Sequence, residues 1–435
     1  MVVGAGCAGA LYSARVASRG FKALLIDRKR EEDLGADSFD LVEMHAIENA
    51  CDGFLKRPGA TKRVKGIEVF GPDSQTRVTL PGEPYILVNR RELSSYLIDE
   101  ARRAGVEVLT QCIAGGVEIE GGAVHAVNTD RGSFACRIAA GASGIERVVC
   151  RDIPRGMGIP RRLRSADYIS TYKETRDINR GAGGFPRTGI YEYHIGRYGG
   201  YSWVYSDGET IDIGTGVQDI QGYPDPRDIV LGYVRSNPLV GENVKARSSG
   251  RIPTRRPLYT MVASGVVVLG DSACQALPLI GRGVGGAITG ALLSSDASAF
   301  ALEAGEVEAG GLWSYNYNYM RERGAHLAAL DCLRVFMQKL QAKDISWSLA
   351  KGAIGERELS AALLGKLELP GIQAKMKKAF RGIKGVPLLV RYQNLLRHAQ
   401  RTLDHYMQYP GDYDAPDFAE WCRQADYLHD DLEKI

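Results

Sequence analysis

The chain opens MVVGAGCAGALYSARVASRGFKALLIDRK, residues 1–29. Three glycines follow a short apolar run and form a GxGxxG motif: Gly4, Gly6 and Gly9. A helical segment follows over about residues 8–18, and the next apolar run, residues 23–26, ends at Asp27. This order of strand, glycine loop, helix and strand is the context that makes a glycine motif informative. It predicts a βαβ unit that binds a dinucleotide.

Each residue of the motif has a physical role in that prediction. Gly4 permits a tight turn, Gly6 allows the backbone to approach a pyrophosphate, and Gly9 allows the helix to contact the strand closely. The pyrophosphate then lies at the positive end of the helix dipole. Asp27 stands where an acid accepts the hydroxyls of an adenosine ribose, and we count Arg28 beside it among the cofactor-binding residues.

The first strand of this unit is unusually short. Only three residues precede Gly4, whereas β-strands usually run about five or six residues. We therefore expect the true start of the protein to lie upstream of Met1.

A second informative stretch is GVVVLGDSACQALPLIGRGVGG, residues 265–286. A buried strand is expected over residues 266–269, followed by Gly270 and Asp271. A carboxylate at a strand end can accept hydrogen bonds from a polyol, and glycines let the backbone approach a flat ring. By itself the stretch is also compatible with an ordinary strand, turn and helix start. Paired with the first motif it predicts FAD, with cofactor-binding residues Gly270, Asp271, Pro278, Gly281, Gly283 and Val284.

Composition limits the classes of protein to consider. The 435 residues are 44% hydrophobic and 25% charged, which is enough for two or three domains with ample cores. A net charge of +3 gives no argument for a nucleic-acid partner. The eight cysteines include no CxxC pair, which argues against a zinc site and a disulfide scaffold and favours a reducing cytoplasm. No apolar run approaches the roughly 18 residues that span a bilayer.

The order of patterns predicts the fold class: α/β with an antiparallel sheet. Residues 88–105 have helical spacing, residues 111–150 alternate in short strands with Gly-Gly turns, and residues 165–250 alternate as in an antiparallel sheet. After about residue 287 the chain reads as helix. We expect a split Rossmann-type FAD-binding domain, an inserted sheet domain for the substrate and a helical C-terminal region. The expected boundaries are 1–60, 85–155 and 250–305 for the FAD-binding domain, 60–85 and 155–250 for the sheet domain, and 305–435 for the helical region.

The chain resembles the FAD-binding fold of p-hydroxybenzoate hydroxylase type, and within it the geranylgeranyl reductase family. Four local matches carry the resemblance over roughly residues 1–300. They are GAGCAG with Asp27; Asn89-Arg90 opening a helix, similar to a short Asp-Arg signature; YSWVYS at 201–206, similar to YxWxFP; and GDSA at 270–273 through PLIGRGV at 278–284, similar to GDAA and PxTGxGI. Through the second match Arg90 is expected to bind FAD.

The chain also departs from the pattern of that family. Tyr205-Ser206 replaces Phe-Pro, and Ala142-Ser143-Gly144 replaces an Asp-Gly motif. Cys51 stands in Cys-Asp-Gly, where the family often has Cys-Gly close to the flavin. These departures affect the prediction of the exact substrate more than the prediction of a bound flavin.

The resemblance implies an oxidoreductase that reduces isolated C=C bonds of prenyl chains with hydride from reduced FAD. Tyr201, Trp203 and Tyr205 lie at i, i+2 and i+4 of a strand and so share one face. Such a face fits an apolar chain and can stabilise transient positive charge; ordinary packing between sheets is the alternative. Candidates for the proton donor are Cys51, Tyr201, His45 and a bound water, although Cys51 also fits a small buried hydrophobe.

Partners follow from what the chain contains. Because no second GxGxxG unit is seen, electrons are expected from a transient donor: a ferredoxin, a reduced deazaflavin or NAD(P)H. Residues 371–403 interleave eight basic with several apolar residues, which fits either peripheral contact with an anionic membrane or an ordinary solvated helix face. A second basic set is a candidate for holding a lipid phosphate: Arg161, Arg162, Arg164, Arg251, Arg255 and Arg256.

Two other functions compete with the prenyl reductase. The same fold supports FAD-dependent monooxygenases that act on aromatic or apolar substrates. A flavin-binding structural or regulatory protein without turnover is the third possibility. Consumption of O₂ with product formation separates the first from a reductase, which works without O₂.

Overall fold

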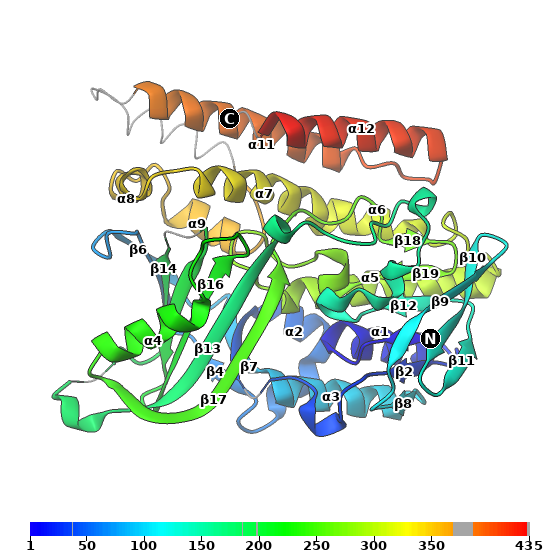
Figure 1. The fold of residues 1–435 in the computed structure, drawn as a ribbon, viewed down its shortest axis with the longest axis horizontal. Helices are drawn as coiled ribbons and strands as arrows, with labels where there is room; N and C mark the ends of the chain where they lie inside the picture. The colour runs from blue at the N-terminus through cyan, green and yellow to red at the C-terminus, as the bar shows by residue number, and fades with distance from the viewer. Residues whose placement is uncertain (37, 185, 197–198, 369–385, 433–435) are drawn as a thin grey trace.

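The computed structural model describes residues 1–36, 38–184, 186–196, 199–368 and 386–432. The sheets lie beneath a stack of C-terminal helices, in which α7 (Ala325–Gln338) packs against α11 (Val386–Met407) and α12 (Ala415–Leu432) (Figure 1). No helix of the described residues is long and apolar enough to cross a membrane.

A six-stranded sheet organises the first part of the fold. Its strands, in spatial order, are β18 (Val262–Ala263), β19 (Val266–Val268), β12 (Ala139–Gly141), β1 (Val2–Val3), β2 (Leu24–Ile26) and β8 (Glu107–Leu109). All neighbours are parallel except β18 and β19. Because the strands come from three distant segments of the chain, the predicted split Rossmann-type domain is confirmed.

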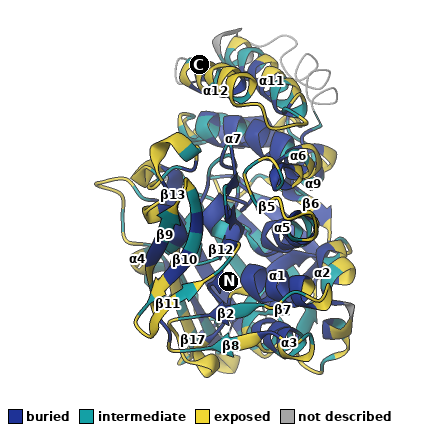
Figure 2. Ribbon diagram, turned by 90° about the vertical axis from the view of Figure 1, so that its right-hand side faces the viewer, coloured by how far each residue is buried: buried dark blue, intermediate teal, exposed yellow. Residues whose placement is uncertain are grey.

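Helices bury this sheet. The central strands carry Val, Ile, Leu, Ala and Gly, as expected of parallel strands that are covered on both faces. Helix α1 (Cys7–Ser18) packs against α3 (Arg90–Arg103) and the long α5 (Val284–Ala304). In Figure 2, α1 and α5 are coloured mostly as buried.

A seven-stranded sheet forms the second part. Its spatial order is β17 (Val240–Pro253), β13 (Tyr168–Ile178), β16 (Thr210–Gln218), β15 (Tyr201–Ser206), β14 (Ile190–Ile195), β5 (Gly66–Phe70) and β6 (Arg77–Pro81). All neighbours are antiparallel except β14 and β5, which are parallel. The predicted antiparallel sheet is confirmed except at this pair, where β5 enters from a distant part of the chain rather than through a hairpin.

One face of the seven-stranded sheet is covered by a helix that the strand pattern did not predict. Helix α4 (Pro226–Ser236) packs Val230 against Ile211 and Ile213. Asp225 caps it by accepting from the N–H of Arg227 at 2.8 Å, and Pro226 stands in its first turn. Asp followed by Pro is a recognised start signal for a helix, which the alternation around it obscured.

Two small sheets and the remaining helices complete the fold. One sheet contains β3 (Phe39–Glu43), β7 (Tyr85–Asn89) and β4 (Thr61–Arg63), and the other contains β11 (Gly132–Ala135), β10 (Ala123–Thr129) and β9 (Ala114–Glu120). The other helices are α2 (Met44–Cys51), α6 (Trp313–Tyr319), α8 (Ala342–Ala350) and α9 (Glu356–Leu363). A π-helical turn, Met320–Gly324, joins α6 to α7.

Candidate active site

A cavity of about 840 Å³ lies between the two large sheets. Its wall contains the segments that were predicted from the sequence to bind the cofactor, together with several that were not predicted. The main lining segments are residues 3–8, 26–29, 142–146, 248–252 and 280–284. Two uncapped helix N-termini, those of α1 and α5, open into it. Unpaired N–H groups and the helix dipole make such ends favourable for negative charge.

The glycine loop is shaped as the motif predicts. Gly4 has φ +107°, and a Cβ on Gly9 would lie 2.0 Å from the Gly4 carbonyl oxygen, so helix and strand touch backbone to backbone. A Cβ on Gly6, in contrast, would meet no atom within 4 Å. Gly6 therefore borders open space at the start of α1, where a pyrophosphate fits.

Asp27 fixes the end of β2 beside this loop. Its Oδ2 accepts from the Ala5 N–H at 2.8 Å, and its Oδ1 accepts from the Lys29 N–H at 2.9 Å. Arg28 extends towards solvent, 3.7 Å from Glu146. These residues line the end of the cavity next to α1, where the adenosine part of a dinucleotide is expected.

Asp271 lies at the centre of the wall. Burial raises the pKa of its carboxyl group, and the Arg90 guanidinium partly opposes that rise. A Cβ on Gly283 would lie 3.0 Å from Asp271 Oδ1, and Gly281 adopts the left-handed φ of +61°. The loop before α5 is thus held close to this carboxylate and presents backbone to the cavity, as the predicted ribityl and ring contacts require.

A charged network joins the small sheet that contains β3 to the seven-stranded sheet at the cavity wall. Asp40 on β3 accepts from Arg90 Nη1 at 2.8 Å and from Lys173 Nζ at 3.0 Å. Burial opposes ionisation of Asp40, but the charges of Lys173 and Arg90 outweigh it and lower its pKa to about 2. Its side chain is still 39% exposed to the cavity. The contacts of Asp40 with Arg90 and Lys173 hold β3, α3 and β13 together.

Aromatic side chains form the opposite wall. Tyr201 and Trp203 of β15 line the cavity with Tyr191 and Tyr193 of β14. The Tyr201 hydroxyl donates to the Ile280 carbonyl, which ties the aromatic strand to the loop before α5. Tyr191 and Tyr193 were not predicted from the sequence, although their alternation in IYEYHI was a usable signal.

No family model matches the chain. Digeranylgeranylglycerophospholipid reductase of Sulfolobus acidocaldarius is 27% identical over 445 residues, covering 100% of this chain and 98% of the relative. The structure of a geranylgeranyl bacteriochlorophyll reductase-like protein of Thermoplasma acidophilum has a TM-score of 0.73 at 18% identity, covering 91% of this chain and 98% of that one. A myxobacterial FAD-dependent halogenase has a TM-score of 0.62 at 18% identity, covering 92% and 96%.

The chain is thus similar over its whole length to a digeranylgeranylglycerophospholipid reductase, and it shares its fold with a geranylgeranyl bacteriochlorophyll reductase-like protein and an FAD-dependent halogenase. The fold is one that binds FAD in such proteins, and FAD is the cofactor that the sequence predicts for this cavity. The residues present fit the cofactor, because the space beside Gly6, the two open helix N-termini and the backbone of residues 281–284 match its pyrophosphate and ring. The monooxygenase alternative is not favoured.

Several residues that the sequence predicted for the site lie outside the cavity wall. Cys51 is buried at the end of α2, and burial raises the pKa of its thiol to about 12. Tyr205 is also buried, and its hydroxyl donates to the Arg63 carbonyl at 3.2 Å, because β15 runs past the edge of the cavity. Gly9, Pro278 and His45 do not line the cavity either. Their proposed roles in binding or catalysis stay predictions.

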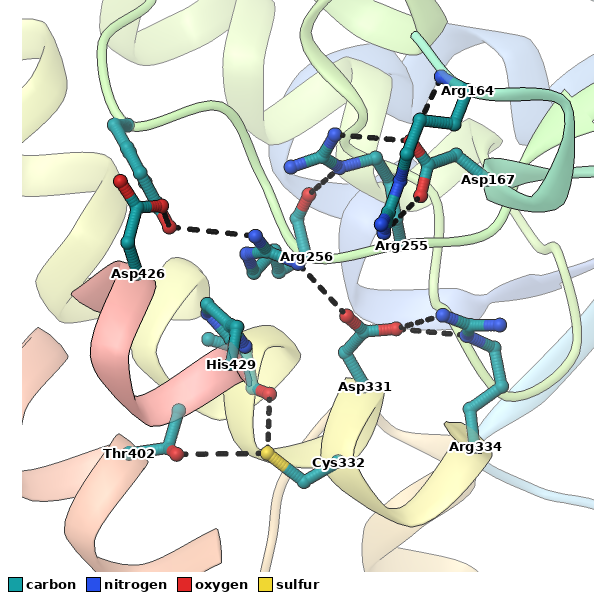
Figure 3. Close-up of polar contacts among 12 residues, drawn as sticks. Arg164, Asp167, Arg255, Arg256, Asp331, Cys332, Arg334, Thr402, Asp426 and His429 are labelled. Atoms are coloured by element: carbon teal, nitrogen blue, oxygen red, sulfur yellow. Dashed lines mark hydrogen bonds and ion pairs between the residues drawn. The ribbon is translucent and has the colours of Figure 1, made fainter. Parts of the chain in front are cut away.

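The arginine set suggested for a lipid phosphate is largely paired with acids. Figure 3 shows Arg164 and Arg255 reaching Asp167, at 3.4 Å and 3.2 Å, and Arg256 reaching Asp331 at 3.8 Å. These pairs lie where the loop after β17 meets the C-terminal helices. The Arg256–Asp331 pair connects this loop to α7, the Arg255–Asp167 pair connects it to the segment before β13, and the pairing leaves little positive charge for a phosphate.

The other members of the set do not change that conclusion. Arg251 is paired with Asp219, and Arg161 Nε donates to the Ile153 carbonyl at 2.7 Å. Arg162 is exposed. Of the basic stretch 371–403, residues 371–385 lie outside the described residues, and the rest belongs to α11.

Two glycine substitutions should separate cofactor binding from folding. Gly6→Ala adds a methyl group to the open space with φ at an ordinary −68°, so the apoprotein should keep its stability while affinity for FAD falls at least about tenfold. Gly9→Ala overlaps the Gly4 carbonyl and should lower the free energy of unfolding by about 1–3 kcal/mol. Urea denaturation of the apoprotein and titration with FAD measure the two effects. Equal behaviour of the two variants would contradict the assignment.

Asp40→Asn should reveal the charged network through pH. The folded pKa of about 2 lies below the ordinary 3.8, so ionisation of Asp40 adds stability that is complete above pH 3.8 and is lost as pH falls towards 2. The variant should therefore be less stable than the parent at neutral pH, and the difference should shrink in acid. Urea denaturation of both proteins from pH 7 to pH 2 checks this; a difference that does not change with pH would contradict it.

Proposed function

We propose that this protein hydrogenates isolated C=C bonds in the geranylgeranyl chains of a digeranylgeranylglycerophospholipid. One observation carries the proposal: an aromatic wall, made by β14 and β15, faces the loop that presents backbone to the FAD ring. A prenyl chain is an apolar substrate, and this wall offers it four rings. A relative aligned over the whole chain bears the name of this activity.

The chain supplies each part of the cofactor site. Gly6 and the N-terminus of α1 would hold the pyrophosphate, Asp27 the adenosine ribose, and Asp271 the ribityl hydroxyls. The backbone of residues 281–284 would support the ring. When bound and reduced, FAD supplies hydride to the substrate. Stabilisation of positive charge on the substrate and exclusion of water are left to side chains of this protein.

An isolated alkene accepts hydride poorly, because no carbonyl group stabilises the negative charge that would develop. Protonation of one carbon gives the other the character of a tertiary carbocation, which then accepts hydride. Aromatic rings stabilise a nearby cation by about 0.5–2 kcal/mol each. The rings of Tyr191, Tyr193, Tyr201 and Trp203 can serve this purpose while they exclude water from the chain.

Tyr201 has a second role at this wall. Burial raises the pKa of its phenol well above the ordinary value, so the proton stays on the oxygen at physiological pH. That proton is directed at the Ile280 carbonyl. Tyr201 thereby holds the loop before α5 against β15 and fixes the width of the gap into which the prenyl chain would enter.

We also propose that the electrons come from a separate donor that docks transiently. A built-in site for NAD(P)H would be expected on a second parallel sheet. In the part of the chain that the structure describes, only the six-stranded sheet has parallel neighbours throughout its centre. A ferredoxin, a reduced deazaflavin and NAD(P)H are the candidate donors. Peripheral membrane contact through residues 371–403 would bring the enzyme to a lipid substrate, and its support is the sequence pattern alone.

The activity can be tested without knowing the natural donor. Purified enzyme is reduced by dithionite without O₂ and mixed with digeranylgeranylglycerophospholipid, and the lipid is analysed by mass spectrometry. The expected products gain two hydrogens for each bond reduced, while the FAD spectrum returns to its oxidised form. A saturated lipid is the control and should leave FAD reduced. Product that gains oxygen and forms only in air would establish a monooxygenase instead.

Trp203→Ala tests the aromatic wall. A Cβ on Gly214 would lie 2.1 Å from the Trp203 ring, so this ring packs against the backbone of β16 at Gly214. Its loss should lower turnover about tenfold, the equivalent of about 1.4 kcal/mol, with FAD content unchanged. Tyr427→Ala, at a residue that is 68% exposed, is the control. Equal loss of turnover and FAD would indicate that Trp203 only packs the core.

A further inference from the structure

Arg282 has an unusual environment for an arginine. It stands between Gly281 and Gly283 in the ring-binding loop, lines the cavity, and has a side chain that is only 9% exposed. Its Nη2 donates to the Leu363 carbonyl at the end of α9. Among the described residues neither its Nε nor its Nη1 has a hydrogen-bond partner within 3.5 Å, and the Tyr85 hydroxyl is the polar group that interacts with this side of the guanidinium. Buried N–H groups of a cation without partners are costly.

The surroundings of Arg282 neutralise it only in part. Glu43 Oε1 lies 3.6 Å from Nη2, and the guanidinium lies 4.9 Å from the centre of the Tyr85 ring. Burial opposes ionisation of Glu43, yet the charges of Arg282 and Arg323 outweigh it and lower its pKa. Glu43 is therefore an anion shared by two arginines.

The cluster of Arg282, Glu43 and Arg323 thus contains two cations and one anion. In the described part of the chain, no other carboxylate pairs with either arginine. Arg323 is also buried, in the π-helical turn, with its Nε unpaired. One positive charge therefore remains uncompensated in a largely buried place, directly behind the loop that supports the FAD ring.

A flavin gains negative charge when it is reduced. With FAD bound, reduction by two electrons and one proton from the donor would add one negative charge to it, and transfer of hydride to the substrate would remove that charge again. Charged groups near the ring nitrogens change the relative stability of these two forms. The net positive charge of the cluster would stabilise the reduced, anionic flavin. The positive end of the α5 dipole, at its open N-terminus, would stabilise it as well.

We propose that Arg282 provides a fixed positive charge that stabilises the reduced, anionic form of FAD and thereby sets the reduction potential of this enzyme, with Glu43 moderating that charge. The glycines on either side leave the loop backbone free to contact the ring while the side chain turns away to Tyr85 and Glu43. The proposal concerns the cofactor alone and does not depend on the identity of the prenyl substrate.

Reduction potentials of matched variants test it. Arg282→Met should weaken binding of reduced relative to oxidised FAD about tenfold, which lowers the potential of a two-electron couple by about 30 mV. Glu43→Gln removes the anion of the same cluster and should move the potential in the opposite direction. Arg282→Lys keeps the charge and should restore most of the parent value. The potentials are measured by equilibration with a reference dye in the absence of O₂ and substrate.

The opposite shifts of the reduction potential in Arg282→Met and Glu43→Gln distinguish an electrostatic role of Arg282 from a purely structural one. If Arg282 served only to anchor α9 through the Leu363 carbonyl, its removal would lower stability without opposite shifts in the Met and Gln variants. If Arg282→Met does not bind FAD, the other two variants still test the proposal. An unchanged reduction potential in Glu43→Gln would overturn it, and so would a reduction potential lowered by as much as about 30 mV in Arg282→Lys. Because no lipid is present, failure of the proposed substrate assignment leaves these results unaffected.

Discussion

The close approach of backbone to backbone at the carboxyl edge of the six-stranded sheet is the constraint on which the rest of the site depends. Gly9 of α1 contacts the Gly4 carbonyl, and a side chain at Gly4 would collide with Ala142 of the segment after β12. These contacts bring three distant segments together and leave the N-terminus of α1 open. Without them the cavity would have neither its anion-binding end nor its depth.

Motifs that act through their own backbone were predictable from the sequence. The roles of the loops at Gly4–Gly9 and Gly270–Val284 follow from their local residue types, because glycines next to a strand-end carboxylate are typical of cofactor-binding loops. The split Rossmann-type domain followed from their separation along the chain. Helix α4 was missed because its start signal, Asp225-Pro226, lies in a region whose alternation indicated strands.

Features that depend on pairing between distant residues were not predictable. Tyr191 and Tyr193 join the site only because β14 pairs with β15 in a register that sets Tyr193 opposite Trp203. Glu43 and Arg282 lie far apart in sequence and meet only when β3 reaches the loop before α5. Cys51 and Tyr205 were reasonable candidates by type, yet their elements carry them past the wall of the cavity.

The two halves of the site place opposite electrostatic demands on the protein. A reduced flavin is stabilised by positive charge, whereas a carbocation in the substrate is destabilised by it. At about 10 Å and an effective dielectric constant near 20, one unit charge contributes about 1.7 kcal/mol, more than tenfold in rate. Two uncompensated arginines would therefore oppose the chemistry at the aromatic wall, while complete neutralisation would leave the reduced cofactor without support. Glu43, shared between Arg282 and Arg323, limits the excess to a single charge, and the rings of Tyr193 and Tyr201 provide cation stabilisation without adding a full negative charge that would repel the anionic flavin.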